Sequence, residues 1–199
     1  MPVNLGTEAK NRAAEAIVQP IKTTTGTLEL LQGSTIIVSF NDVQFPGSAS
    51  NGTVTASAIA PKDATAAGTV NAWRLKDNGG VVIASGVAGQ RYQIAALNRA
   101  TSTIEVTGNV TAQFPARSSL TLHNKNDTTQ NVYILVDDDP PTYDAVSNRT
   151  SIPVHPDLNA PPYSTLTWTH VHPGELGLDN SNIQVDQRVT VDSFKITVP

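Results

Sequence analysis

The stretch that most constrains the fold is residues 68–88, GTVNAWRLKDNGGVVIASGVA. Two apolar runs flank an Asp-Asn-Gly-Gly sequence at its centre. Asn-Gly is a preferred pair for a type I′ turn, because both central residues of that turn need positive φ. A turn at Asn78 and Gly79 would place Lys76 opposite Val81 in a β-hairpin. Since both faces of this hairpin are apolar, we expect it to lie inside a larger sheet rather than at its rim.

The composition favours β-structure. The chain has 199 residues, enough for one large β domain or two small ones. Only 15% of the residues are charged and 5% are aromatic, and this profile suits sheets joined by polar loops better than a long helical bundle. We therefore expect an all-β fold, mainly an antiparallel β-sandwich, with one short N-terminal helix.

Charge and hydropathy argue against several classes of partner. The formal net charge is −4 and the 13 Lys and Arg residues form no basic run, so we expect no nucleic-acid partner. Without cysteine, the chain has no disulfides, thiolate zinc sites or cysteine nucleophiles. No apolar run approaches the roughly 18–20 residues that span a bilayer, and the N-terminus lacks the layout of a signal peptide. We expect a soluble protein with no membrane partner, made without export.

The one predicted helix covers residues 5–18, LGTEAKNRAAEAIV. Its apolar residues recur at helical spacing, and polar residues occupy the other side. The apolar stripe consists of Leu5, Ala9, Ala13, Ala16 and Ile17. Asn4 or Thr7 could cap this helix, and Pro20 should stop it. We expect the helix to pack over the end of a sheet, and docking on a partner subunit is the alternative.

Short strands separated by turn signals are predicted along the rest of the chain, as in β-sandwiches. They cover residues 27–31, 35–40, 53–59, 91–95, 103–107, 120–123, 132–136 and 150–154. Residues 164–172 (STLTWTHVH) alternate strictly, so a strand there would place Trp168, His170 and His172 on one face. In the hairpin, Trp73 should be buried against the helix or the opposing sheet.

Two further kinds of segment complete the expected organisation. The C-terminal residues 182–198 should form paired strands with a turn at Asp186 and Gln187. Residues 137–141 and 153–162 are rich in proline, which favours extended backbone. We expect these two segments to form ordered arms or long surface loops.

Five segments from the two ends of the chain form a recognisable set: AKNRAAEAI, GTLELLQG, NGTVTASAI, GTVNAWRLKDNGGVVIASGVAG and NIQVDQRVTVDSFKITVP. Together they resemble the small β-sandwich virion proteins of tailed bacteriophages. In those relatives, a segment like GVAG is followed within a short loop by the closing strands, whereas residues 89–173 lie between them here. This departure implies a discontinuous β-sandwich domain, residues 1–88 plus 174–199, and a second small β domain, residues 89–173, inserted in it with its Pro-rich arms.

The insert has a resemblance of its own. Its segment GNVTAQFPARSSLTLHNKNDTTQNVYILVDDDPPTYDAVSNRTSIPV carries an FPA turn, an ND–TQNVY stretch and an NRTSIPV strand. In these features it is similar to a small β module that recurs in phage structural proteins. Neither resemblance brings catalytic or cofactor-binding residues with it.

Histidines are the most tempting candidates for chemistry. His170 and His172 point the same way on a strand, so both imidazoles could reach one metal ion, with His123 and His155 as further candidates. A transition-metal site usually needs a third ligand, and nothing in the pattern marks one. We favour the alternative, a polar strand face or a pH-sensitive contact, and assign no metal ligand.

Other motifs also favour a protein without catalysis. The run Asp137, Asp138 and Asp139 lacks the D-x-[DN]-x-[DN]-G ladder of a calcium loop, so we interpret it as a solvated loop. No G-x-S-x-G, H-E-x-x-H or G-x-x-x-x-G-K-[ST] motif occurs, and the Gly/Ser-rich residues 47–52 open no helix that could cradle phosphate. We therefore expect no enzyme, no catalytic or cofactor-binding residues and no cofactor.

The expected function is structural. The phage resemblance implies a non-enzymatic virion protein, assembled in the host cytoplasm. The first expectation is a capsid decoration, or cement, protein that binds the major capsid protein as a homo-oligomer, and the alternative is a tail, baseplate or fibre-attachment component. A carbohydrate-binding module is a third class, which would need exposed aromatic side chains gathered from Tyr133, Tyr143, Tyr163 and Trp168.

Overall fold

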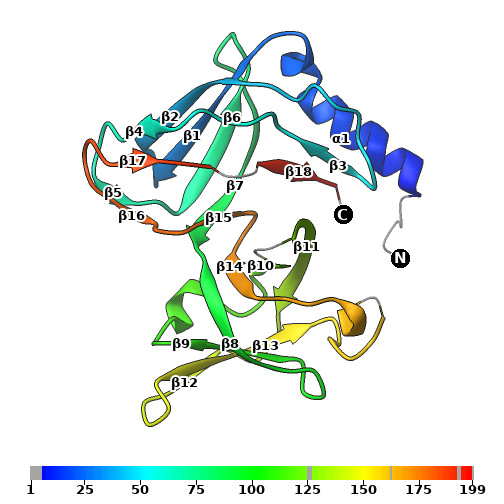
Figure 1. Ribbon diagram of the computed structural model, residues 1–199, viewed down its shortest axis with the longest axis vertical. Helices are drawn as coiled ribbons and strands as arrows, with labels where there is room; N and C mark the ends of the chain where they lie inside the picture. Colours follow the sequence, from blue (N-terminus) through cyan, green and yellow to red (C-terminus); the bar gives the residue numbers. More distant parts are fainter. Residues whose placement is uncertain (1–5, 125–126, 162, 192–193, 199) are drawn as a thin grey trace. The chain divides into compact units, whose positions relative to one another are not determined.

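Strands dominate the computed structural model of this protein, which describes residues 6–124, 127–161, 163–191 and 194–198 (Figure 1). One α-helix accompanies several antiparallel sheets, so the all-β expectation is confirmed. In the described residues, no helix combines the length and the apolar character that crossing a membrane would take. The chain divides into two compact units, Met1–Gly86 with Asn182–Pro199 and Val87–Ser181.

Both expected domain boundaries differ from the observed division, which falls after Gly86 rather than after Ala88, and before Asn182 rather than before Gly174. We expected the chain to return to the first domain at residue 174, but residues 174–181 group with the second unit. The reason is local pairing: strand β15 (Leu176–Leu178) lies parallel to residues 88–90 at the end of strand β7 (Val82–Gln90). This pairing had no signal in the sequence pattern, because parallel partners are far apart along the chain.

The main sheet of the first unit contains four strands in the order β7, β6 (Ala72–Lys76), β1 (Gly26–Gln32) and β2 (Thr35–Val43). On β1, Leu28 and Leu30 alternate toward the core, and Leu30 pairs with Trp73 of β6. Trp73 is only 5% exposed, and its ring meets Phe194 edge-on with 5.0 Å between ring centroids. The expected burial of Trp73 is confirmed.

The turn of the β6–β7 hairpin differs from the type I′ turn expected at Asn78 and Gly79. Asp77 and Val81 close the turn, because the Asp77 amide donates to the Val81 carbonyl at 2.9 Å. The residue with positive φ is Gly80, at 83°. This is the three-residue loop in which a left-handed residue follows a type I turn. The hairpin itself is confirmed, but its register is displaced by one residue, and residues 82–86 of β7 border the sheet instead of lying inside it.

Helix α1 (Thr7–Lys22) is longer than predicted and buries a different face. It begins after Gly6, which makes no side-chain cap hydrogen bond, and it continues through Pro20. The buried side chains are Ala14, Val18 and Ile21. They replace the predicted stripe of Ala9, Ala13, Ala16 and Ile17, whose fifth member, Leu5, lies outside the described residues. The larger Val18 and Ile21 bury more apolar area than alanines do, and this gain favours the observed face.

The remaining strands of the first unit form three short antiparallel pairs. These are β3 (Thr53–Thr55) with β18 (Lys195–Thr197), β4 (Lys62–Asp63) with β17 (Arg188–Val189), and β5 (Gly68–Thr69) with β16 (Asn182–Ile183). The C-terminal strands therefore pair with an earlier part of the chain, and not with one another. A turn does occur where predicted, with Asp186 at φ 62° and the Gln187 amide donating to the Gln184 carbonyl at 3.1 Å.

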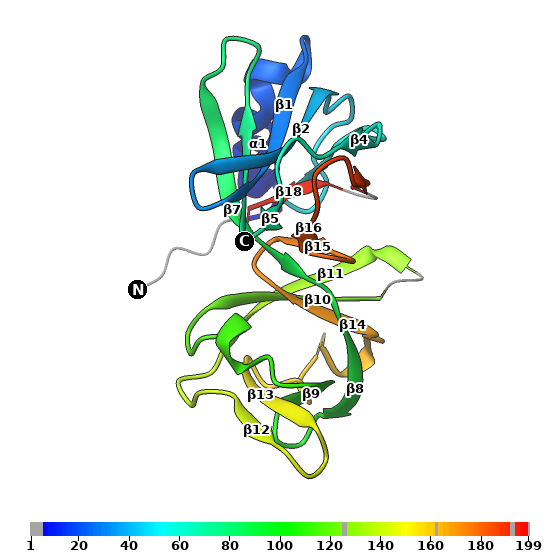
Figure 2. The ribbon, with the colours of Figure 1, turned by 90° about the vertical axis from the view of Figure 1, so that its left-hand side faces the viewer.

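The second unit is a barrel. Its seven strands follow the order β11 (Asp127–Val136), β10 (Ser119–Asn124), β14 (His170–Pro173), β8 (Tyr92–Asn98), β9 (Thr103–Thr107), β13 (Arg149–His155) and β12 (Thr142–Asp144). A further pairing of β11 with β13, Leu135 with His155 and Val136 with Val154, closes the sheet and leaves β12 outside the ring. Figure 2 shows these strands curving round. Single 3₁₀ turns lie at Thr111–Gln113 (η1) and Tyr163–Thr165 (η2).

The strands of the barrel alternate apolar side chains into one core. The core comprises Ile104, Val106, Val110, Phe114, Leu120, Leu122, Ile134, Val136, Ile152, Val154, Leu158, Trp168 and Val171. The strand predicted at residues 164–172 is wrong over residues 164–169, since β14 begins only at His170. Trp168 enters the core from an irregular segment, so it does not share a face with His170 and His172 as predicted.

The described residues of the second proline-rich segment, 153–161, combine the exposed residues of a surface loop with an anchor in the barrel. Their first residues belong to β13, and Leu158 is fully buried in the barrel core. Arg99 holds the loop by donating to the carbonyls of Tyr163 at 2.6 Å and Leu166 at 2.7 Å. Its guanidinium also lies 5.2 Å from the centroid of the Trp168 ring. The segment is therefore a packed part of the second unit.

Candidate functional site: a histidine cluster on the barrel

Three of the four histidines of the chain gather on two neighbouring strands of the barrel. In the antiparallel pairing of β10 with β14, His123 lies opposite His170, and Thr121 lies opposite His172. The His123 ring centroid is 5.4 Å from that of His170 and 5.5 Å from that of His172. Because Leu122 and Val171 alternate into the core, the histidines occupy the outer face of the barrel wall.

Two members of this histidine cluster are buried. His123 is 7% exposed and His172 is 4% exposed. Burial lowers the pKa of His123 to about 3, and the positive charge of Arg91 acts in the same direction. Burial likewise lowers the pKa of His172 to about 4, against a hydrogen bond with the Pro173 carbonyl that raises it. Both imidazoles are therefore neutral at pH 7.

The geometry of the cluster does not favour a metal. The His123 and His170 rings lie within 26° of parallel, so they present faces to each other rather than nitrogens to a shared point. His170 has its Nδ1 at 2.8 Å from the Thr169 hydroxyl, and His172 has its Nδ1 at 3.3 Å from the Pro173 carbonyl. Among the described residues, no group of three or more His, Cys, Asp or Glu side chains is arranged to hold a metal ion. The cluster is best suited to respond to protonation.

The other candidates from the sequence do not join this cluster. His155 ends β13 and pairs with Leu135, away from the β10–β14 pairing. Of the three consecutive aspartates, Asp138 accepts two hydrogen bonds from Arg117, at 2.6 and 3.2 Å, and the whole run is exposed. Residues 47–52 form a loop with no helix after them.

Among the described residues, the four candidate aromatic side chains do not gather into a sugar-binding face. Tyr133 is half-buried on β11. Trp168 lies in the barrel core, and Tyr163 packs against that core. Tyr143 is 37% exposed on β12, outside the closed ring. Stacking on a sugar needs aromatic faces presented together to solvent, and this placement does not provide them.

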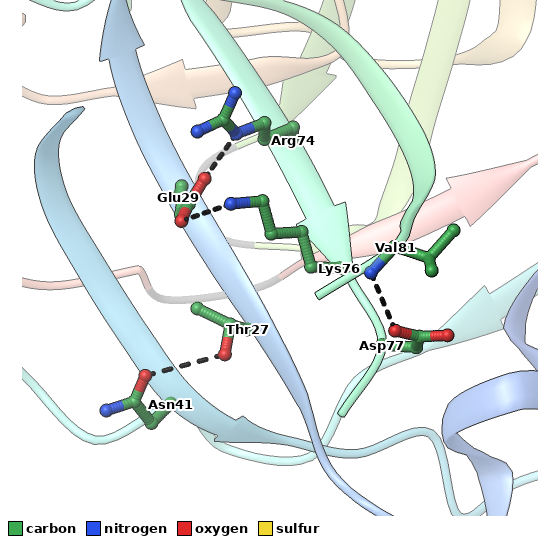
Figure 3. Close-up of polar contacts among 7 residues, drawn as sticks. All are labelled: Thr27, Glu29, Asn41, Arg74, Lys76, Asp77 and Val81. Carbon is green, nitrogen blue, oxygen red and sulfur yellow. Dashed lines mark hydrogen bonds and ion pairs between the residues drawn. The ribbon is translucent and has the colours of Figure 1, made fainter. Parts of the chain in front are cut away.

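A charged cluster on the first unit was not found from the sequence. Glu29 of β1 lies between Arg74 and Lys76 of β6, and both cations donate to its carboxylate (Figure 3). The Glu29 side chain is only 7% exposed. Burial alone would raise the pKa of Glu29, but the hydrogen bonds and charges of the two cations lower it below its usual value. The only hint in the sequence was a single acidic residue within the apolar run LELL. The partners of Glu29 follow from the register of β1 and β6, which the sequence does not reveal.

Comparison of the chain with protein-family models, with curated proteins and with solved structures finds no match. The resemblance to phage structural proteins therefore depends on the short segments quoted from the sequence.

Proposed function

We propose that the protein is a non-enzymatic structural component of a tailed-phage virion, and that it decorates the capsid by binding the major capsid protein. The resemblance of both chain ends and of the insert to phage structural modules supplies this setting. The all-β architecture, with a barrel inserted in a sheet-rich unit, is compatible with it. Binding, rather than chemistry on a substrate, is the proposed mode of action.

The proposal is supported by the contacts of three charged side chains, each of which binds other parts of its own chain. Arg99 donates hydrogen bonds to three backbone carbonyls between residues 158 and 166. Glu29 is enclosed by two cations of the neighbouring strand. Arg91 donates to the Gly177 carbonyl and to Asp179. A catalytic group has to face a bound substrate, whereas these groups face their own protein and hold its segments in place.

Docking of helix α1 on a partner subunit was the alternative to its packing over a sheet. The apolar face of α1 is buried within the first unit through Ala14, Val18 and Ile21. Among the described residues, the most exposed large apolar side chain is Val146, which is 98% exposed in the turn between β12 and β13. Asp144 holds this turn by accepting from the Val146 amide at 2.9 Å and from the Ser147 hydroxyl at 2.7 Å. A fixed turn that presents an apolar residue loses little conformational entropy on binding.

The test is to locate the protein on particles and to weaken its attachment. Fluorescently labelled protein, added to particles that lack it, should bind the capsid at many sites, and Val146→Asp should weaken binding by about tenfold, which corresponds to roughly 1.4 kcal/mol. Val185→Asp is the matched control, because Val185 is also exposed, at 53%, but lies in the first unit. Label confined to the tail would replace the capsid proposal with the tail or baseplate alternative.

Particle stability gives an independent measurement. A protein that binds only the assembled shell stabilises it by mass action, and a stable attachment buries at least about 1,000 Å². Particles without the protein should therefore release DNA at lower temperature and after milder osmotic shock than complete particles. Equal robustness of the two kinds of particle would contradict the decoration role.

A further inference from the structure

The histidine cluster lies beneath a short segment that we call the strap, residues 174–179. The strap follows β14 and contains β15. Its first residue is fixed twice to β10: the Gly174 amide donates to the Ser119 carbonyl at 2.9 Å, and the Thr121 hydroxyl donates to the Gly174 carbonyl at 2.7 Å. Further along, the Glu175 amide donates to the Val87 carbonyl at 3.1 Å, and Glu175 accepts from the Val87 amide at 2.7 Å. The strap is therefore held by hydrogen bonds, and all of these partners lie within the second unit.

The strap packs directly on His172. A Cβ atom added at Gly177 would lie 2.4 Å from Cδ2 and 2.8 Å from Nε2 of the His172 ring. No side chain larger than hydrogen fits at this position without displacing the ring or the strap. The backbone of the strap thus covers the imidazole and accounts for part of its burial. Any change that requires water around His172 has to lift the strap.

Charged groups around the cluster make protonation unfavourable. Arg91 lies directly before β8 and holds the strap through the Gly177 carbonyl and Asp179, each at 3.0 Å. Its positive charge disfavours protonation of both His123 and His172. The charges of His170 and His172 also oppose protonation of His123, and of the described groups that act on His123 only Asp179 favours it. A proton on either buried ring would therefore be opposed by the positive charge of Arg91.

We propose that this cluster is a proton-operated latch: protonation of His172 and His123 in mild acid releases the strap from the barrel, while the barrel itself stays closed. The strap leads the chain back to the first unit at Asn182, so its release frees one of the two chain connections between the units. The barrel does not depend on the strap, because its closure comes from the pairing of β11 with β13.

The direction in which pH shifts strap opening follows from the histidine pKa values in the closed and open states. With the strap in place, both rings have depressed pKa values, about 3 for His123 and about 4 for His172. With the strap released, the rings approach the ordinary histidine pKa of about 6.5. The open state therefore binds more protons, and opening becomes more favourable as the pH falls from about 6.5 toward 4. Each ring that becomes solvated increases the opening constant by about tenfold per pH unit in this range.

Hydrogen exchange of the full-length protein tests the latch. Protection of the Gly174 and Glu175 amides, corrected for intrinsic exchange rates, should fall by at least about 100-fold between about pH 7 and about pH 4.5. Protection of the Ile104 and Val106 amides in the barrel should stay unchanged. In the double variant His123→Gln and His172→Gln, strap protection should become independent of pH. His155→Gln is the matched control and should behave as the wild type does, because His155 is exposed and lies outside the cluster.

Two measurements keep the latch testable if the double variant fails to fold. In the wild type, NMR titration should show the His172 ring titrating well below its ordinary range, followed by loss of the strap signals. Gly177→Ala should open the strap already at neutral pH, because the added methyl group clashes with the ring. The proposal is overturned if strap protection is the same at both pH values, if it falls equally in the double variant, or if the barrel amides lose protection together with the strap.

Discussion

Single buried side chains account for much of what holds the first unit together. Trp73 is the clearest case, because it joins the main sheet to the C-terminal segment through its edge-on contact with Phe194. Phe194 also meets Phe45, with 6.0 Å between ring centroids. Three aromatic rings from distant parts of the sequence therefore pack together in one core.

Removal of the Trp73 ring should be costly. We expect Trp73→Ala to lower the free energy of unfolding by about 3–5 kcal/mol, because it leaves a cavity that the surrounding strands cannot fill. The measurement is urea denaturation followed by circular dichroism, with the transition of the first unit analysed separately. Val185→Ala, at an exposed position, should leave the midpoint unchanged. An unshifted midpoint for Trp73→Ala would show that the ring contributes little to the core.

Glu29 provides a second prediction at the scale of the residue. Glu29→Ala removes the carboxylate to which Arg74 and Lys76 donate. Because solvent partly screens the charges of these two cations, we expect the free energy of unfolding to fall by only about 1–2 kcal/mol. Glu8→Ala is the matched control: Glu8 pairs with Arg12 on α1, and both side chains are about four-fifths exposed, at 79% and 80%. This control should change stability little. If the two substitutions lowered the free energy of unfolding equally, burial would not strengthen the contribution of Glu29.

The same carboxylate predicts a pH dependence. The pKa of Glu29 is lowered in the folded protein, where burial, which by itself raises it, is outweighed by the two cations. The folded state therefore holds its proton less tightly than the unfolded chain, and the stabilisation is present above the ordinary Glu pKa of about 4.5. It should disappear as the pH falls through the folded-state value. The difference in unfolding free energy between wild type and Glu29→Gln, measured from pH 7 downward, should shrink only below about pH 4.5.

At the scale of the element, the β6–β7 hairpin shows how a turn sets register. The type I′ turn needs positive φ at Asn78 and Gly79, but only Gly80 has it. The Asp77 side chain contributes by accepting a hydrogen bond from the Val81 amide at 2.8 Å, drawn in Figure 3. That bond stabilises the longer loop, which shifts the pairing by one residue relative to the expected hairpin.

A pair of glycine substitutions distinguishes the two turns. Gly80→Ala should cost about 1–2 kcal/mol, because alanine is strained at φ 83°. Gly79→Ala should cost less, since Gly79 does not have a positive φ and the added methyl group would approach only the Asp77 side chain, at 3.3 Å. Thermal unfolding of the two variants gives the comparison. A larger loss of stability for Gly79→Ala than for Gly80→Ala would instead support the type I′ turn.

At the scale of the whole molecule, each unit has its own apolar core and its own pattern of closure. The first unit is discontinuous in sequence, because its strands β16, β17 and β18 return after the barrel and pair with β5, β4 and β3. The barrel closes through β11 and β13 with both partners inside the insert. This organisation suggests that the two units can be separated.

We expect the first unit to fold without the barrel. A protein in which a short Gly/Ser linker replaces residues 87–181 should unfold cooperatively and keep Trp73 in an apolar environment, since loop length affects stability only weakly, by about 0.6 kcal/mol per doubling. Calorimetry and tryptophan fluorescence provide the measurement, because Trp168 is absent from this protein and Trp73 is the remaining reporter. The isolated residues 87–181 serve as the complementary protein. A disordered product for residues 1–86 plus 182–199 would mean that the first unit needs the insert.

The sequence by itself determined the class of fold and the position of most strands. Alternation of apolar residues is a local signal, so the strand at Thr103–Thr107 was found with its observed limits and the burial of Trp73 was anticipated. The sequence also singled out His123, His170 and His172 as candidates. It could not place His123 beside the other two, because the pairing of β10 with β14 joins residues about 50 positions apart through register alone.

Only the tertiary structure decided which side chains share a face and which segments close the barrel. The face of α1 depends on the larger side chains that fill the core, Val18 and Ile21, and not on the alanine periodicity. Trp168 enters the core because Arg99 fixes an irregular loop where strict alternation predicted a strand. The strap lies over His172 because a glycine backbone fits against the ring, and this close approach depends on segments that meet only in the folded chain.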